Sequence, residues 1–190
     1  MSKNTFLDQD FQGEDFSNTV LPNGEYDNCT FVNCQFSNTD LSYNTFSECQ
    51  FIDCDMANAA IKETAFRDVL FRNCKLLGWQ FDECHSFLLS FHFDGCILNY
   101  ASFYQLKLKK IFFKRCQLLE VDFTECDLSQ ARFDQCDLSG AVFNRTLLEK
   151  ADLRTALNYS IDPANNQVKK AKFSLTGIAG LLDKYDISIE

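Results

Sequence analysis

The chain has 190 residues, a formal net charge of −9 and 46% hydrophobic residues, which suits a single soluble domain. An acidic chain lacks the basic footprint of a protein that binds DNA directly. No stretch approaches the roughly 18 continuous apolar residues of a membrane-spanning helix. The start, MSKNTFLDQDF, has no apolar run typical of a signal peptide. We therefore expect a cytoplasmic protein that contacts neither nucleic acid nor membrane directly.

The negative charge is unevenly distributed along the chain. Residues 1–61 contain ten acidic residues against Lys3 alone, whereas residues 62–190 contain 17 acidic and 17 basic residues. The first third of the chain therefore carries the whole imbalance. Solubility alone is one explanation of such an excess.

Large apolar residues recur every five positions along most of the chain. The first register contains sixteen consecutive central residues: Phe6, Phe11, Phe16, Leu21, Tyr26, Phe31, Phe36, Leu41, Phe46, Phe51, Met56, Ile61, Phe66, Phe71, Leu76 and Phe81. The second register, displaced by two residues, contains thirteen: Phe93, Leu98, Phe103, Leu108, Phe113, Leu118, Phe123, Leu128, Phe133, Leu138, Phe143, Leu148 and Leu153. A helix repeats near 3.6 residues and a strand at 2, so neither element explains a period of five.

Small residues follow the same rule. All ten cysteines lie two positions before the central position of a five-residue unit: Cys29, Cys34, Cys49, Cys54, Cys74, Cys84, Cys96, Cys116, Cys126 and Cys136. Alanines share this position, which we call the small-residue slot. The remaining three positions of each unit are almost all polar. This pattern predicts a solenoid whose coil has four sides of five residues, with successive coils paired as parallel strands about 4.8 Å apart.

The stretch CDLSQARFDQCDLSGAVF, residues 126–143, fits the pattern A(D/N)LXX and resembles the pentapeptide-repeat family. The resemblance implies an all-β solenoid, a right-handed quadrilateral parallel β-helix, over residues 1–156. Twenty-nine units give about seven coils and a rod of roughly 35 Å.

The repeat argues against catalysis and metal binding. Cysteines five residues apart lie on different sides of the coil, and those twenty apart stack, so we expect free, buried and inert thiols. The two histidines, His85 and His92, lie in one irregular segment where a local structural role suits them. The outward-facing acids lack the burial that tunes a general acid. We expect no enzyme activity, no cofactor and no metal.

The two registers differ by two residues, so an insertion must fall within residues 79–92. This segment places Trp79 in a small-residue slot and Ser86 where a large apolar residue belongs. We expect a bulge or a kink there. It is either a tolerated loop or a protrusion that contacts a partner.

Residues 157–190 differ in kind from the repeats. After a turn-rich segment around Pro163, apolar residues recur at helical spacing and predict a short helix, with Thr176 as a candidate N-cap. Ile187 and Ile189 then alternate with polar residues, as in a final strand. A solenoid end must be covered, by its own chain or by a second copy. We favour a homodimer through the C-terminus, formed by Leu175, Ile178, Leu181, Leu182, Tyr185 and Ile187.

The apolar C-terminal segment and the stretch LNYASFYQLKLKKIFFKRCQL resemble Qnr-type quinolone-resistance and microcin immunity proteins. That resemblance implies a DNA-mimicking dimer that binds a type II topoisomerase, DNA gyrase or topoisomerase IV, and protects it from a quinolone or a toxin. The candidate partner-binding surface is a band of acids: Glu120, Asp122, Glu125, Asp127, Asp134 and Asp137.

Two features leave the function open. A basic cluster of Lys107, Lys109, Lys110, Lys114 and Arg115 does not suit a DNA mimic. It either contacts an acidic patch or balances repulsion within the rod. The repeats also lack the long loops that many Qnr-type proteins use in protection. The alternative function is a structural or regulatory rod that binds a different protein partner.

Overall fold

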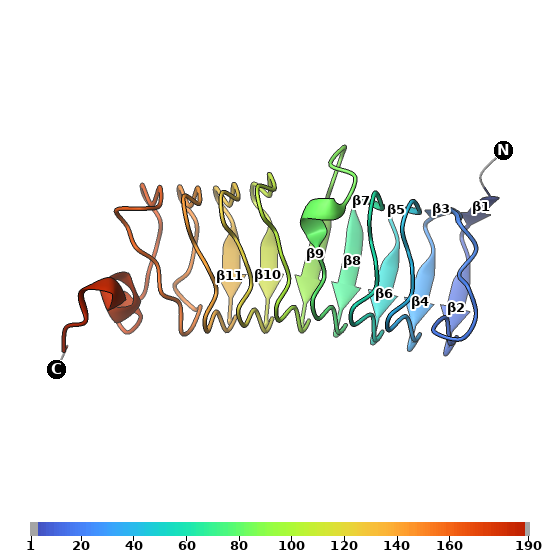
Figure 1. Ribbon diagram of the computed structural model, residues 1–190, viewed down its shortest axis with the longest axis horizontal. Helices are drawn as coiled ribbons and strands as arrows, with labels where there is room; N and C mark the ends of the chain where they lie inside the picture. Colours follow the sequence, from blue (N-terminus) through green and yellow to red (C-terminus); the bar gives the residue numbers. More distant parts are fainter. Residues whose placement is uncertain (1–3, 189–190) are drawn as a thin grey trace.

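A computed structural model describes residues 4–188 as a long rod with the two chain ends at opposite ends (Figure 1). Two parallel sheets run along it. The four-stranded sheet contains β1 (Asn4–Leu7), β3 (Gly24–Asp27), β5 (Thr45–Ser47) and β7 (Ala65–Arg67). The seven-stranded sheet contains β2 (Asp10–Gln12), β4 (Thr30–Val32), β6 (Gln50–Ile52), β8 (Val69–Arg72), β9 (Phe91–Asp94), β10 (Phe112–Lys114) and β11 (Arg132–Asp134).

Strand register follows the five-residue rule. Phe11 pairs with Phe31 and Phe31 with Phe51, so each coil takes twenty residues. The rings of these residues stack face to face, with centroids 4.6 Å and 4.7 Å apart. Central residues from all four sides pack along the axis and are almost all buried. The predicted parallel solenoid is therefore confirmed.

The corners of the coil need a left-handed backbone. The residue two positions after a central residue has positive φ at almost every corner, for example 50° at Asn28, 53° at Asn33 and 55° at Asn58. Asparagine tolerates this conformation because its short polar side chain bonds locally. Glycine serves the same position at Gly13 and Gly95, with φ of 67° and 70°.

The small-residue slot also has a hydrogen-bonding role that the sequence pattern does not reveal. The Cys54 thiol donates to the carbonyl oxygen of Phe31, 3.4 Å away, and the Thr64 hydroxyl donates to that of Leu41 at 2.8 Å. Thr146 does the same to Phe123 at 2.8 Å. All ten cysteines are free and buried. Burial raises the pKa of Cys49 to about 12, so its thiol stays protonated and unreactive near neutral pH.

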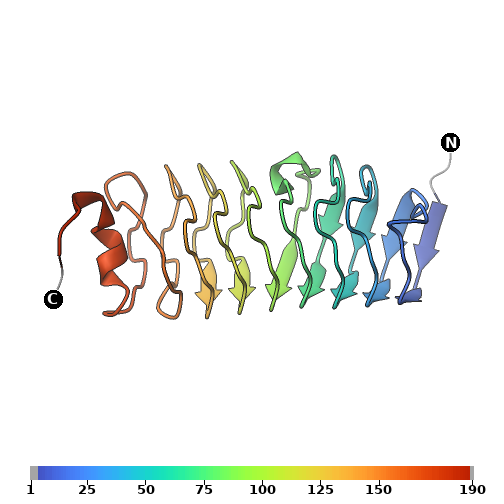
Figure 2. The same ribbon diagram turned by 60° about the horizontal axis from the view of Figure 1, so that its bottom comes forward.

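The register break lies between β8 and β9. Val69 pairs with Phe91 and Phe71 with Phe93, a spacing of 22 residues instead of 20. The extra residues bulge from the rod as a loop after η1 (Phe81–Glu83), and the coils continue in the same direction on both sides (Figures 1 and 2). The stack of Phe71 on Phe93, with centroids 5.4 Å apart, crosses the break intact. The insertion is therefore a bulge rather than a kink.

Trp79 is buried because the bulge removes a residue from the axis. Ser86, at the position of a central residue, is exposed. The Trp79 ring occupies the axis instead, with its centroid 5.8 Å from Phe66 and 5.7 Å from Phe71. Its Nε1 donates to the Met56 carbonyl oxygen at 2.6 Å, the bond that a cysteine or threonine makes in other slots. Phe91, also in a slot, is buried, with its ring centroid 5.1 Å from that of Phe81.

Parallel pairing does not end at residue 156. Bridges join Leu147 to Gln167 and Asp152 to Lys172, so the ladder passes through the turn-rich segment around Pro163. In the slot position, Asn166 donates its Nδ2 to the Phe143 carbonyl oxygen at 3.0 Å. Side-chain hydrogen bonding and the packing of Val168 and Phe173 on the core thus keep the coil regular beyond the interruption of the repeat.

The C-terminal segment forms two short 3-10 helices, η2 (Ile178–Leu181) and η3 (Asp183–Tyr185), rather than one α-helix. Gly177 and Gly180 disfavour an α-helix here. Both glycines pack closely on Tyr159, since a Cβ on Gly180 would lie 2.0 Å from the Tyr159 carbonyl oxygen. Ser174, not Thr176, accepts the N–H of Gly177. Ile187 is not in a strand, and Ile189 lies outside the described residues. No helix within residues 4–188 has the length and apolar character to cross a bilayer.

Removal of the Trp79 indole should be among the most destabilising single changes in the rod. Trp79→Ala would leave a cavity on the axis and an unpaired Met56 carbonyl, and we expect a cost of about 3–5 kcal/mol in urea unfolding. Trp79→Phe retains an aromatic ring and should cost clearly less. A cost below about 1 kcal/mol for Trp79→Ala would contradict the compensation of the bulge by the indole.

Candidate partner-binding surface

The coil has four faces, named A to D in chain order. Face A contains β1, β3, β5 and β7, and beyond the bulge the ladder Lys107, Asp127, Leu147, Gln167. Face B contains the seven-stranded sheet and then Asp152 and Lys172. Face C follows the ladder Asp15, Gln35, Asp55, Lys75, Ile97, Gln117, Asp137, Leu157. Face D contains Asp40 and Ala60, then Gln80, Ser102, Asp122 and Val142.

The six acids of the predicted band lie on all four faces. Asp122 and Glu125 belong to face D, and Glu120 lies at the adjoining corner of face C. Asp127 is on face A, Asp134 is in β11 on face B, and Asp137 is on face C. The band therefore wraps around the rod, and no single flat partner surface could contact all of it.

Many aspartates serve the fold itself. An aspartate just before a central residue accepts the backbone N–H two positions ahead: Asp122 from Thr124 at 2.8 Å and Asp137 from Ser139 at 3.0 Å. The aspartate carboxylate thus supplies a local hydrogen-bond acceptor for the outward-facing N–H of the turn. Hydrogen bonding from Ser139 lowers the pKa of Asp137 despite partial burial, with a further contribution from Asn158. The presence of these carboxylates is explained by the turns of the repeat and is not by itself evidence of a binding partner.

Three of the five residues of the basic cluster form ion pairs within the rod. Lys114 and Arg115 reach the carboxylate of Asp94 in the preceding coil, at 3.3 Å and 2.6 Å. Lys109 reaches Asp127 in the next coil at 3.4 Å. These pairs favour the role of balancing repulsion.

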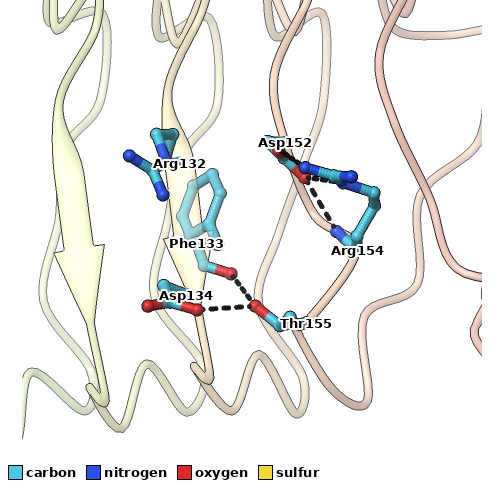
Figure 3. Close-up of a pocket in the computed structure, with 6 residues that line it drawn as sticks. All are labelled: Arg132, Phe133, Asp134, Asp152, Arg154 and Thr155. Atoms are coloured by element: carbon cyan, nitrogen blue, oxygen red, sulfur yellow. Dashed lines mark hydrogen bonds and ion pairs between the residues drawn. The ribbon is translucent and has the colours of Figure 1, made fainter.

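An open groove of about 290 Å³ lies on face B and is lined by Arg132, Phe133, Asp134, Asp152, Arg154 and Thr155 (Figure 3). Several of its polar groups are paired with one another, and the Arg132 guanidinium lies over the Phe112 ring, 4.8 Å from the centroid. Arg154 donates to both oxygens of Asp152, at 2.9 Å and 2.8 Å, and the Thr155 hydroxyl donates to Asp134 at 3.0 Å. The lining contains no nucleophile with an adjacent base. Across residues 4–188 no group of three or more histidine, cysteine or carboxylate side chains is arranged to hold a metal ion.

Residues of the proposed dimer interface differ in exposure. Leu175 is 89% exposed, and Ile178, Tyr185 and Ile187 are also exposed. Leu181 packs against the core, and Leu182 is half-buried. The C-terminal end of the rod thus presents several exposed apolar side chains.

Sequence reasoning did not single out face D. Along it lie Glu63, Asp82 and Glu83, all exposed, and the exposed tyrosines Tyr43 and Tyr104. Assigning every residue to a face by counting twenty per coil, and 22 across the bulge, would have revealed this surface.

Four sides of five residues around a packed axis define a parallel β-solenoid. Residues 24–91 and 86–173 match the family described as "Pentapeptide repeat region", and the chain belongs to this pentapeptide-repeat family.

The solved structures add a likeness in fold. A trypsin-treated variant of QnrB1, a plasmid-mediated fluoroquinolone resistance protein, aligns over 100% of this chain and 92% of its own, with 20% identity and a TM-score of 0.59. A second variant of QnrB1 aligns over 98% and 100%, with 21% identity and a TM-score of 0.49. No protein of curated function is a significant match.

Lowering the pH should destabilise the rod through its turn aspartates. The folded pKa values of Asp40 and Asp137 lie below the ordinary 3.8, so the stabilisation from these two carboxylates is complete above that pH and is lost as pH falls through the folded values. Asp137→Ala should cost about 1 kcal/mol at pH 7, and Asp137→Asn, which keeps an acceptor, should cost less. Urea unfolding between pH 7 and pH 2 measures both effects. Stability that stays flat over this range would contradict the assignment.

Proposed function

We propose that the protein binds a type II topoisomerase, DNA gyrase or topoisomerase IV, as a mimic of the DNA duplex, and protects the enzyme against a quinolone or a peptide toxin. The observation that carries the proposal is a group of acids without ion pairs on face D, although Glu125 and Asp162 on the same face pair with Arg145 and Lys184. Glu63, Asp82 and Glu83 contribute to it and make no ion pair among residues 4–188. The likeness in fold to QnrB1 is consistent with it. The protein acts by binding rather than catalysis.

The charge of the rod limits the mimicry to one side. B-DNA carries about one negative charge per 1.7 Å, or roughly twenty along a rod of about 35 Å, against a formal net charge of −9 for the whole chain. Ion pairs such as Lys114 with Asp94 reduce the field of face B further. A topoisomerase that recognised this rod would therefore read a strip of carboxylates rather than a full duplex. The proposal requires a cytoplasmic protein, because type II topoisomerases act on the chromosome.

A homodimer through the C-terminus would extend the strip. The exposed apolar side chains of Leu175, Ile178, Tyr185 and Ile187 lie at one end of the rod, where a second copy can bury them. Two rods joined at these ends would double the length of the mimic and place both N-terminal acidic regions at its far ends.

A second candidate is a rod that binds a different protein partner. Its support is the structural role of the turn aspartates: Asp122, Asp127 and Asp137 accept backbone N–H groups whatever the partner. Much of the acidity is then a property of the repeat.

Gyrase supercoiling with increasing amounts of purified protein, alone and with a quinolone or a gyrase-poisoning peptide toxin, tests the proposal. We expect rescue from the poison at low concentration and inhibition of supercoiling at high concentration, since a mimic competes with the duplex itself. The matched assay with topoisomerase IV identifies the preferred enzyme. If neither effect appears with either enzyme at tens of micromolar protein, the second candidate replaces the first.

Charged substitutions at the C-terminal end should separate the dimer. Leu175→Glu combined with Ile178→Glu would place carboxylates in the proposed interface, and we expect monomers by light scattering at concentrations where the unaltered protein is dimeric. Val20→Glu, an equally drastic change at an 87% exposed residue near the other end, is the control and should leave the dimer intact. A monomeric unaltered protein would contradict the dimer.

A further inference from the structure

We propose that face D docks an arginine-rich protein surface, and that Glu63, Asp82 and Glu83 provide the charge while Tyr43 and Tyr104 receive the guanidinium groups. This inference rests on the proposed function, because it names the face and the side-chain chemistry by which the rod would recognise a topoisomerase. It also has a test that does not involve that enzyme.

Charge is distributed unequally among the four faces. Over residues 4–188, the outward positions of face D contain seven acids, Asp40, Glu63, Asp82, Glu83, Asp122, Glu125 and Asp162, against two bases, Lys62 and Arg145. Face B, on the opposite side of the coil, contains five acids and six bases, and face A contains seven of each. The net negative charge of the rod is thus concentrated on face D and the adjoining face C.

The fold does not need the acids at the centre of face D. Turn aspartates accept a backbone N–H, whereas the carboxylates of Glu63 and Glu83, at the left-handed corner or its equivalent, accept none from residues 4–188. The Glu63 N–H donates to the Glu83 carbonyl oxygen at 2.8 Å, so the two glutamates lie in register on successive coils. Like charges opposite each other on neighbouring strands are destabilising. A partner of opposite charge would remove that cost.

Exposed aromatic side chains accompany these acids. Tyr43 is 55% exposed and Tyr104 is 39% exposed on face D, and Tyr100, 57% exposed, lies at the adjoining corner of face C. The coil's other tyrosines, Tyr26 and Tyr159, are buried.

The tyrosines select arginine over lysine. A guanidinium group stacks on an aromatic face and forms paired hydrogen bonds with a carboxylate, whereas an ammonium group is a point charge. Gln105 supports this arrangement by donating to the Tyr104 hydroxyl at 2.9 Å and to Glu125 at 2.6 Å. Complementarity therefore favours arginine as the partner residue.

A peptide of ten arginines, labelled with a fluorophore, is the direct probe. We compare the full-length protein with a face D variant, Glu63→Gln, Asp82→Asn and Glu83→Gln. The matched control removes the same charge from exposed residues of face A: Glu25→Gln, Asp27→Asn and Glu48→Gln. We expect at least a tenfold loss of affinity for the face D variant and less than threefold for the control. Equal losses would show that only net charge matters and would overturn the proposal.

The tyrosines are tested with a second probe of ten lysines. Tyr43→Ser combined with Tyr104→Ser should weaken binding of the arginine peptide at least threefold and leave the lysine peptide nearly unchanged. Equal effects on both peptides, or no effect on either, would overturn the selection of arginine. Urea unfolding of each variant shows whether the coil is retained.

The same variants in the gyrase assay separate this inference from the proposed function. If the face D variant loses protection and the face A control keeps it, both stand. If the unaltered protein has no effect on gyrase but the peptide results hold, the topoisomerase proposal fails and the assignment of face D remains. Full protection by the face D variant would overturn the inference alone.

Discussion

Axial packing of one large apolar residue from every five-residue side is the constraint on which the rest of this structure depends. It fixes the length of each side, makes successive coils parallel and in register, and forces the corners into left-handed conformations such as that of Asn28. It also explains the bulge, because the coil tolerates the departure of Ser86 only with the Trp79 ring in the vacated space. The stack of Phe71 on Phe93 shows how completely the axis is restored.

The same constraint separates structural acidity from acidity available to a partner. Turn aspartates such as Asp137 are part of the repeat, and their carboxylates are occupied by backbone N–H groups. Acids at the other outward positions are free of that role. Where they meet bases, as at Asp94 with Lys114 and Arg115, the surface is balanced. Where they do not meet bases, as at Glu63 and Glu83, the surface of the rod has a negative electrostatic potential that can attract a basic partner.

The fold was predictable from the sequence because its period is unique to one architecture and the cysteines mark the slot without exception. The functional surface was not. Acids close in sequence, such as Asp122 and Asp134, lie on different faces, and only the exact path through the bulge tells which residues share a face. The extension of the coil to Lys172 was also hidden, since Asn158 and Pro163 interrupt the apolar repeat and the hydrogen bonds of Asn166 join the packing of Val168 and Phe173 in holding the last coil. Likewise, the packing of Gly180 on Tyr159 is a tertiary contact that helical spacing could not reveal.

Competition between this protein and a fluorescent DNA duplex for gyrase tests the central claim most directly. Mimicry of the duplex predicts that the protein displaces the bound DNA completely, with an apparent affinity that weakens in proportion to the DNA concentration. A ternary complex of gyrase, DNA and protein, or no binding to gyrase at all, would contradict the account.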